Sequence, residues 1–178
     1  MISQKMADAL NRQINNEMYS AYLYMSMSAY SSNVGLNGFA TWFMVQYHEE
    51  MFHAMKQYNY VLDQGAAVHL QAIKEPPKTF ASAKDMFEKT LEHEKFVTKS
   101  INEIADLAQQ EKDHATYQFI QWYVGEQVEE EKNDNELLQK LKLAGESGPG
   151  LFMIDEQLAT RALTVQSDFS QGILGAAT

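Results

Sequence analysis

The sequence predicts an all-α fold, namely a four-helix bundle with one long crossover between its second and third helices and a short fifth helix. Three observations lead to this prediction. The 178 residues suffice for one domain with a sizeable core. The chain has only 3 Pro and 9 Gly against 10 Met, and its Gly and Pro gather in a few places instead of recurring at the short intervals typical of all-β chains. Between those places, apolar residues recur at helical spacing.

The first pair of helices is predicted at about 3–31 and 38–63. The stretch 31–35, Ser-Ser-Asn-Val-Gly, is a short turn that makes the second helix an antiparallel neighbour of the first. The second helix is expected to end near Gly65. One face of each helix carries a core-forming stripe. The stripes comprise Leu10, Ile14, Glu17, Ala21, Tyr24 and Ser28 in the first helix, and Phe39, Phe43, Gln46, Glu50, His53 and Gln57 in the second.

A long irregular connection follows Gly65 and contains Pro76 and Pro77. Connections of this length in a compact domain usually carry function or cross the fold. At about 3.3 Å per residue, such a segment can exceed the length of a bundle helix. We therefore expect it to return along the bundle.

The second pair of helices is predicted at about 82–110 and 113–144. The stretch from Ser82 to Asp85 resembles a weak capping box at the start of this pair. The stripes comprise Phe87, Leu91, Glu94, Thr98, Ile101 and Ala105, then Ile120, Tyr123, Gln127, Glu130, Asp134, Leu137 and Leu141.

The glycine-rich stretch 145–150 ends the bundle, which we place at about 3–144 within one domain spanning 1–178. A short fifth helix at about 151–163 and a polar tail at 164–178 complete the chain. Two antiparallel helical hairpins, one crossover and an appended helix are thus expected.

The composition excludes several classes of function. Asp and Glu number 24 against 14 Lys and Arg, which gives a formal charge of -10, so binding to a nucleic-acid backbone is disfavoured. The chain has no Cys, which excludes disulfides and thiolate metal sites and leaves oxygen and imidazole as metal ligands. No apolar stretch is long enough for a membrane span or a leader. We expect a cytoplasmic protein without nucleic-acid or membrane partners.

Each helical stripe contains polar residues where a core face should be apolar. A buried charge is unfavourable unless it is paired or binds a metal. By the predicted boundaries, these residues fall at about the same height in an antiparallel bundle, so they can meet at one point. They are Glu17, Glu50, His53, Glu94, Gln127 and Glu130.

The spacing of these residues is duplicated. Glu50 and His53 follow Glu17 by the same intervals at which Gln127 and Glu130 follow Glu94. Each half thus supplies one Glu from one helix and a pair at i and i+3 from the next, which lie on one helix face. A dinuclear carboxylate site in a bundle is typically built in this way, although with Glu-x-x-His in both halves.

The charges agree with a metal site. The four Glu supply four negative charges, which two divalent ions would neutralise, and oxygen ligands with one imidazole suit iron or manganese. We expect Glu17, Glu50 and His53 to hold one ion more tightly than Glu94 and Glu130 hold the other. Glu50 is the expected bridge. A lone Glu-x-x-His on a helix is more often a solvated face, but four interrupted stripes at one level are harder to obtain by chance.

Four motifs surround these residues, namely EMYS at 17–20, HEEMFH at 48–53, HE at 93–94 and QWYVGEQVEEEK at 121–132. They closely resemble non-haem bacterial and archaeal ferritins of the ferritin-like di-iron superfamily, and the likeness covers almost the whole chain. The resemblance implies an iron storage protein with ferroxidase activity, which oxidises Fe(II) with dioxygen or hydrogen peroxide. It also implies that the ferric mineral is deposited inside a homo-oligomeric shell of twenty-four subunits.

Carried over residue by residue, the resemblance assigns Glu17, Glu50 and His53 to the first iron and Glu50, Glu94 and Glu130 to the second, with Gln127 beside it. A weaker third iron position would use acids next to this centre, for which a solvated acidic face is the alternative reading. Tyr24 matches a tyrosine near the di-iron centre, or is simply a core tyrosine. The acids that match the third position are Glu49, Glu126, Glu129 and Glu130.

Some residues depart from related families. Bacterioferritins use Glu-x-x-His in both halves, whereas the second half here reads Gln127 to Glu130. Met51 lies where bacterioferritins place a haem ligand, yet haem-free relatives share it, so no haem is predicted. Animal ferritins line an entry channel with acids where this chain has Tyr117 and Ile120, so the resemblance does not carry over their iron entry path.

Two other functions remain open from the sequence. One is a peroxide-consuming di-iron or di-manganese bundle enzyme, similar to rubrerythrins or manganese catalases, although the Cys-rich domain of rubrerythrins has no counterpart in this sequence. The other is a non-catalytic helical interaction protein whose buried polar residues specify helix register.

Overall fold

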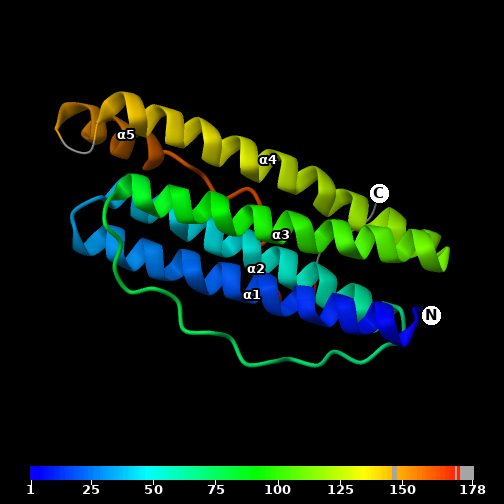
Figure 1. Cartoon of the computed structure of the whole chain (residues 1–178). Coiled ribbons are helices and arrows are strands. Elements are labelled where there is room, and N and C mark those ends of the chain that lie inside the picture. The colour runs from blue at the N-terminus through cyan, green and yellow to red at the C-terminus, as the bar shows by residue number, and fades with distance from the viewer. Residues whose placement is uncertain (146–147, 171, 173–178) are drawn as a thin grey trace.

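The computed structural model describes residues 1–145, 148–170 and 172. Within these ranges the chain forms helices and no strands, which confirms the predicted fold class. Four long helices make the bundle and a short one packs against its end (Figure 1). The helices are α1 (Gln4–Asn33), α2 (Asn37–Asp63), α3 (Ala83–Glu111), α4 (His114–Ala144) and α5 (Pro149–Leu158).

Side-chain caps fix three of the helix starts. The Ser3 hydroxyl accepts a hydrogen bond from the backbone of Met6, and the Ser82 hydroxyl accepts one from Asp85 at 3.1 Å, as the capping motif predicts. Asp113 caps α4 in the same way. The turn before it is so short that Lys112 adopts a left-handed backbone conformation, with φ 56°.

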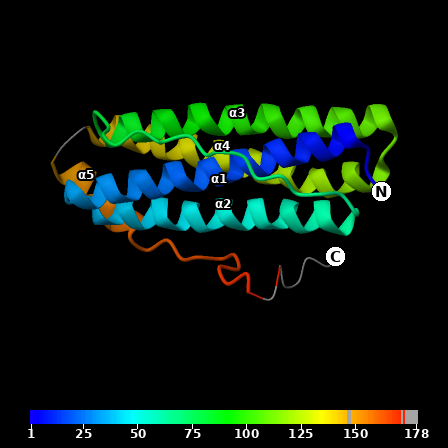
Figure 2. The ribbon, with the colours of Figure 1, turned by 90° about the horizontal axis from the view of Figure 1, so that it is seen from below.

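The connection between α2 and α3 runs along the outside of the bundle from one end to the other (Figures 1 and 2). This confirms the predicted crossover. Hydrogen bonds fasten it to α1, because the Ser26 hydroxyl donates to the carbonyl of Pro77 and the Tyr30 hydroxyl donates to that of Phe80. Consequently α2 and α3 run in the same direction, while α1 and α4 run opposite to them.

The fifth helix begins two residues earlier and ends five residues earlier than the sequence predicted. Pro149 begins it, since a proline needs no hydrogen-bond donor in the first turn. A turn ends it, in which the backbone of Arg161 donates to the carbonyl of Leu158. The helix packs closely against the start of α2, where a Cβ on Gly38 would lie 1.7 Å from the carbonyl oxygen of Asp155. Only glycine permits this approach.

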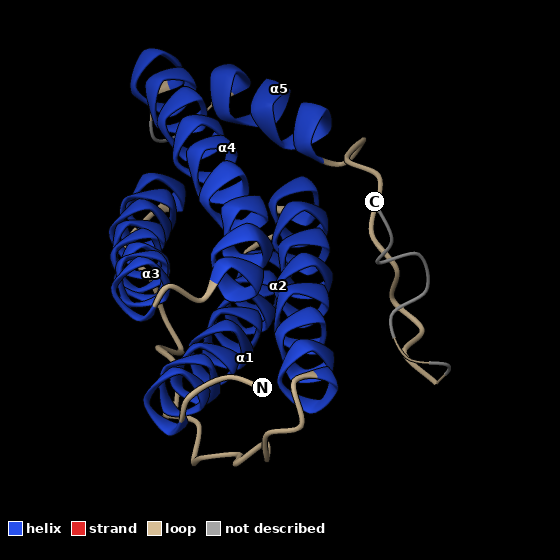
Figure 3. Ribbon diagram, turned by 90° about the vertical axis from the view of Figure 1, so that its right-hand side faces the viewer, coloured by secondary structure: helices blue, strands red, loops and turns tan. Residues whose placement is uncertain are grey.

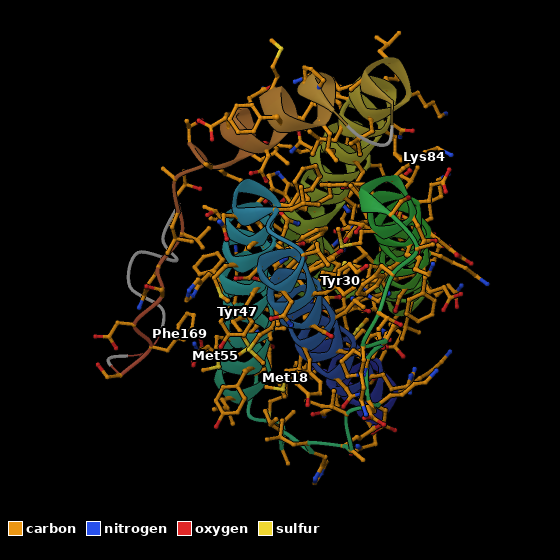
Figure 4. All side chains as sticks on the ribbon, turned by 90° about the vertical axis from the view of Figure 1, so that its left-hand side faces the viewer. Met18, Tyr30, Tyr47, Met55, Lys84 and Phe169 are labelled. Atoms are coloured by element: carbon orange, nitrogen blue, oxygen red, sulfur yellow. The ribbon has the colours of Figure 1, made fainter. Side chains whose placement is uncertain are left out.

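After α5 the chain turns back beside α2 (Figure 3). In Figure 4 the segment that carries Phe169 runs along the side of α2 that bears Tyr47 and Met55. Part of the predicted polar tail, 171 and 173–178, lies outside the described residues, as do 146–147 of the predicted breaker. In the described ranges, every helix is too polar or too short to cross a bilayer.

The predicted stripes form the interior of the bundle. Of all their members, only Leu91 and Thr98 keep partial exposure. The apolar core is divided into two clusters, one around Tyr24, Phe43 and Phe87, and the other around Ile14, Ile101 and Ile120 at the opposite end. The candidate site residues lie on the stretches of helix between these two clusters.

Candidate metal centre

The structure buries all six polar residues that the sequence singled out from the stripes. Glu17 comes from α1, Glu50 and His53 from α2, Glu94 from α3, and the remaining pair from α4, so every long helix contributes. Their exposed fractions range from 1% for Glu17 and Glu94 to 7% for Glu130. Burying so many ionisable groups in one layer requires protons, partners or bound cations.

The residues of the first hairpin converge most tightly. One potential ligand atom from each of Glu17, Glu50 and His53 lies within 4.8 Å of the other two. His53 Nδ1 lies 3.5 Å from a carboxylate oxygen of Glu50. Among the described residues, this is the one cluster of three or more His, Cys, Asp or Glu side chains that meets such a distance.

Two amides orient the Glu17 carboxylate. The side chains of Gln13 and Gln57 both donate to its Oε1, at 3.0 and 3.1 Å. Its other oxygen, Oε2, is buried and has no hydrogen-bond partner among the described residues. A buried acceptor without a donor is uncommon in a native protein. The free lone pairs of Glu17 thus fit a bound cation between this residue, Glu50 and His53.

The carboxylates of the second hairpin are also held by hydrogen bonds. The Tyr24 hydroxyl donates to Glu94 Oε1, and the Gln127 amide donates to Glu94 Oε2 at 3.0 Å. The Gln46 amide donates to Glu130 at 3.0 Å. Tyr24 is thus fully buried, and it both belongs to an apolar core cluster and contacts Glu94.

Burial makes these carboxylates hard to ionise. It is the main cause that raises the pKa of Glu50 well above its ordinary value, and the neighbouring Glu94 and Glu17 carboxylates raise it further. Burial also raises the pKa of Glu17 and of Glu94. The pKa of Glu130 rises to about 8 for the same reason, with repulsion from Glu94 second. Without cations, burial therefore favours the protonated form of these carboxyl groups, and Glu130 keeps its proton at neutral pH.

The donor set fits iron. Carboxylate oxygens with one imidazole are the ligands of non-haem iron and manganese sites in helical bundles. Divalent ions bound in place of the protons would neutralise the carboxylates and would give Glu17 Oε2 a partner.

The acids matched to a third iron position are more dispersed. The side chain of Glu49 forms a 2.6 Å ion pair with Arg161, which follows α5. Glu126 lies 3.9 Å from His53 Nε2, and Glu129 is exposed. Arg161 is in turn stacked over the ring of Trp42 at 4.5 Å. The carboxylate of Glu49 is thus already paired with the basic side chain of Arg161.

The sequence reasoning did not assign Gln13, Gln46, Gln57 or Arg161 to the site. Gln46 and Gln57 stood in the α2 stripe as polar residues on a core face, so a signal was present. Gln13 lies one turn before Glu17, a position from which an amide can reach a carboxylate. Nothing local marked Arg161, because its partner Glu49 is distant in sequence.

Comparison with known proteins places these features in context. The family model described as a ferritin-like domain matches residues 7–144. A bacterial non-heme ferritin of Campylobacter jejuni is 42% identical over 164 residues, which cover 92% of this chain and 98% of the relative. A bacterial non-heme ferritin of Escherichia coli O157:H7 is 39% identical, with 90% and 97% covered.

Solved structures agree with this result. An open-pore ferritin from the hyperthermophilic archaeon Archaeoglobus fulgidus superposes with a TM-score of 0.90 at 50% sequence identity, and the match covers 91% of this chain and all of the other. A humanized archaeal ferritin gives a TM-score of 0.91 at 49% identity, over 92% of this chain and 99% of the other.

Proposed function

This chain belongs to the ferritin family, and on that premise we propose that it stores iron and oxidises Fe(II) to Fe(III) at the layer of buried carboxylates. In this proposal Glu17, Glu50 and His53 bind one ferrous ion, and Glu50, Glu94 and Glu130 bind the second. The observation that carries the proposal is a convergent group of ionisable side chains, buried between two apolar clusters, in which Glu17 Oε2 has no protein partner.

The two-ion arrangement explains the chemistry. Two ferrous ions that share Glu50 are close enough for one oxidant molecule to accept an electron from each of them. Two electrons and two protons convert dioxygen to hydrogen peroxide, or hydrogen peroxide to water. The buried carboxylates hold protons when no cation is bound, because burial raises the pKa of Glu50 and Glu130. Binding of the ions therefore releases protons at the place where the oxidant needs them.

The Tyr24 hydroxyl donates to Glu94, so it orients one ligand of the second ion. Burial and the nearby Glu94 carboxylate raise the pKa of Tyr24 well above its ordinary value, so the phenol keeps its proton. We propose that Tyr24 positions Glu94 and is close enough to supply an electron during oxidation. The Gln127 amide holds the other oxygen of Glu94 and has the same positioning role.

Storage requires an assembly, and we propose a shell of twenty-four copies into which the ferric product is deposited. Its subunit contacts would bury exposed apolar side chains of the first hairpin, such as Tyr22, Met25 and Met44. The excess of acidic residues would serve to collect ions and to start mineral growth.

Oxygen-free protein mixed with two ferrous ions per subunit tests the proposal. On addition of dioxygen, we expect rapid formation of ferric iron with uptake of one dioxygen per two ions. Gel filtration of iron-loaded protein should give a species near half a megadalton that carries iron. Turnover of hydrogen peroxide without oxidation of iron would instead identify a peroxide-consuming enzyme. Unchanged metal content in Glu50→Ala would identify a purely structural polar layer.

A further inference from the structure

A second layer of unpaired polar atoms lies beside the candidate metal centre. Asp134 and Gln46 both have an exposed fraction of 0%. Within the part of the chain that the structure describes, neither carboxylate oxygen of Asp134 nor the amide oxygen of Gln46 has a hydrogen-bond partner. Three buried oxygen atoms without a hydrogen-bond partner are unfavourable, since each has lost its hydration and gained nothing in return.

The helix directions bring these atoms to one level. Asp134 follows Glu130 by four residues on α4, and Gln46 precedes Glu50 by four residues on α2. Because α2 and α4 run in opposite directions, both steps lead toward the α5 end of the bundle, by about 6 Å (Figure 1). The Gln46 amide donates to Glu130 at 3.0 Å, so the two helices are in contact at this level.

Oxygen atoms that could bind a metal surround Asp134, and among the described residues no basic side chain forms a hydrogen bond with it. Tyr24, from α1, lies near enough for the Asp134 carboxylate to raise the pKa of its hydroxyl group. Burial, followed by repulsion from Glu94 and Glu130, raises the pKa of Asp134 to about 9. The positive charge of Arg161 lowers the pKa of Asp134, but the hydrogen bonds of Arg161 go to Glu49 and Trp42.

We propose that Asp134 and Gln46 form a further binding position for a hard divalent cation, Fe(II) or Mn(II), with Glu130 as a ligand shared with the dinuclear centre. Carboxylate and amide oxygens are the donors that such ions prefer. A cation at this position would replace the proton that burial keeps on Asp134 and would give the unpaired oxygen atoms a common partner. This position differs from the third iron position of the resemblance, whose other acids are Glu49, Glu126 and Glu129.

Crystals of oxygen-free protein soaked in manganese chloride test this position directly. We expect anomalous scattering between Asp134 and Gln46 in the wild type, in addition to the peaks at the dinuclear centre. In Asp134→Asn this peak should disappear while the peak beside Glu17 and His53 remains. A water or an empty space between Asp134 and Gln46, with the dinuclear centre occupied, would overturn the proposal.

Calorimetric titration with Mn(II) supplies a second measurement in solution. Wild-type protein should bind one more ion per subunit than Asp134→Asn. The matched control is Asp155→Asn, because Asp155 is also buried but accepts a hydrogen bond from the backbone of Phe39, which an asparagine can still accept. Equal stoichiometry in wild type and Asp134→Asn would refute the extra position.

The test remains decisive if Asp134→Asn does not fold, since the wild-type crystals alone show the ion or its absence. Asp134→Leu provides a further check. Removing a buried carboxyl group without partners should raise the melting temperature of metal-free protein and reduce the rise that Mn(II) causes. Oxidation of ferrous iron by the same wild-type sample reports separately on the proposed function, so the two proposals fail independently.

Discussion

The two helical hairpins carry the same spacing of polar residues but hold them differently. In the first hairpin, Glu17, Glu50 and His53 converge within 4.8 Å, and one oxygen of Glu17 is unpaired. In the second hairpin, the carboxylates of Glu94 and Glu130 already accept hydrogen bonds from neighbouring side chains. Glu17 also accepts two hydrogen bonds, but both go to one of its oxygens, so the first hairpin keeps a free carboxylate oxygen beside two convergent side chains, whereas both oxygens of Glu94 are already bonded.

This difference teaches how a duplicated pattern yields two unequal sites. At the position of His53, the second half has Glu130 and therefore lacks an imidazole. At the position of Glu50, it has Gln127, which lacks the negative charge and carries an amide that can donate a hydrogen bond. That donor holds Glu94 at 3.0 Å. In the proposed centre, an ion in the second position would compete with these bonds and would therefore be held more weakly than the first. Weaker ligation would let ferric iron leave for storage.

The largest expected effect follows from the pair Glu50 and Gln127, which are equivalent in the two halves. Glu50→Ala removes a ligand from both proposed ions, so the rate of rapid iron oxidation should fall by more than the roughly 10–100-fold typical of residues that only orient ligands. Gln127→Ala should stay within that range. Stopped-flow absorbance of ferric iron measures both. Similar rates for Glu50→Ala and wild type would remove the bridging role.

A smaller effect is expected for His53 and Glu130, the second equivalent pair. His53→Ala should weaken binding of the first Mn(II) ion by at least about 10-fold, because it takes one of three convergent ligands. Glu130→Ala should leave the first ion in place and weaken the second. Calorimetric titration of oxygen-free protein separates the two steps. Loss of the first ion in Glu130→Ala would show that the tighter ion is bound by the second hairpin and not by the first.

The sequence sufficed to predict the helices and the buried position of the six polar residues, because helical periodicity and duplicated spacing are local signals. It did not predict the hydrogen-bond asymmetry between the halves, since that depends on amides such as Gln46 and Gln13 that reach across or along helices. The contact between Glu49 and Arg161 was also missed. Such pairs join residues far apart in sequence and become evident only when the chain has folded.

The stability of metal-free protein should depend on pH in the direction set by its buried carboxylates, Glu130 among them. The pKa of Glu130 is raised to about 8 by burial, above its value in the unfolded chain. A group of this kind stabilises the fold fully below its unfolded pKa, and this stability is lost as pH rises through the folded pKa. The melting temperature should therefore fall between about pH 5 and pH 8.

Two comparisons isolate the contribution of Glu130. Glu130→Gln should flatten the fall in melting temperature, since an amide does not titrate. Saturating Mn(II) should also remove the fall, because the ion takes the place of the protons. Scanning calorimetry across the range measures both. A melting temperature that rises with pH in metal-free protein would contradict the buried, protonated state.

The smallest expected effect concerns Arg161, which pairs with Glu49 at 2.6 Å and so competes with any third ion for that carboxylate. Arg161→Gln should strengthen binding of a third Mn(II) ion by a few-fold and leave the first two unchanged, because a partly exposed ion pair is weak. Lys140, Arg161 and Glu49 line one surface cavity, so Lys140→Gln removes a nearby positive charge without breaking the ion pair and is the matched control. An equal gain in both variants would assign the effect to net charge. A gain in Arg161→Gln alone would show that the segment after α5 limits how many ions the subunit holds.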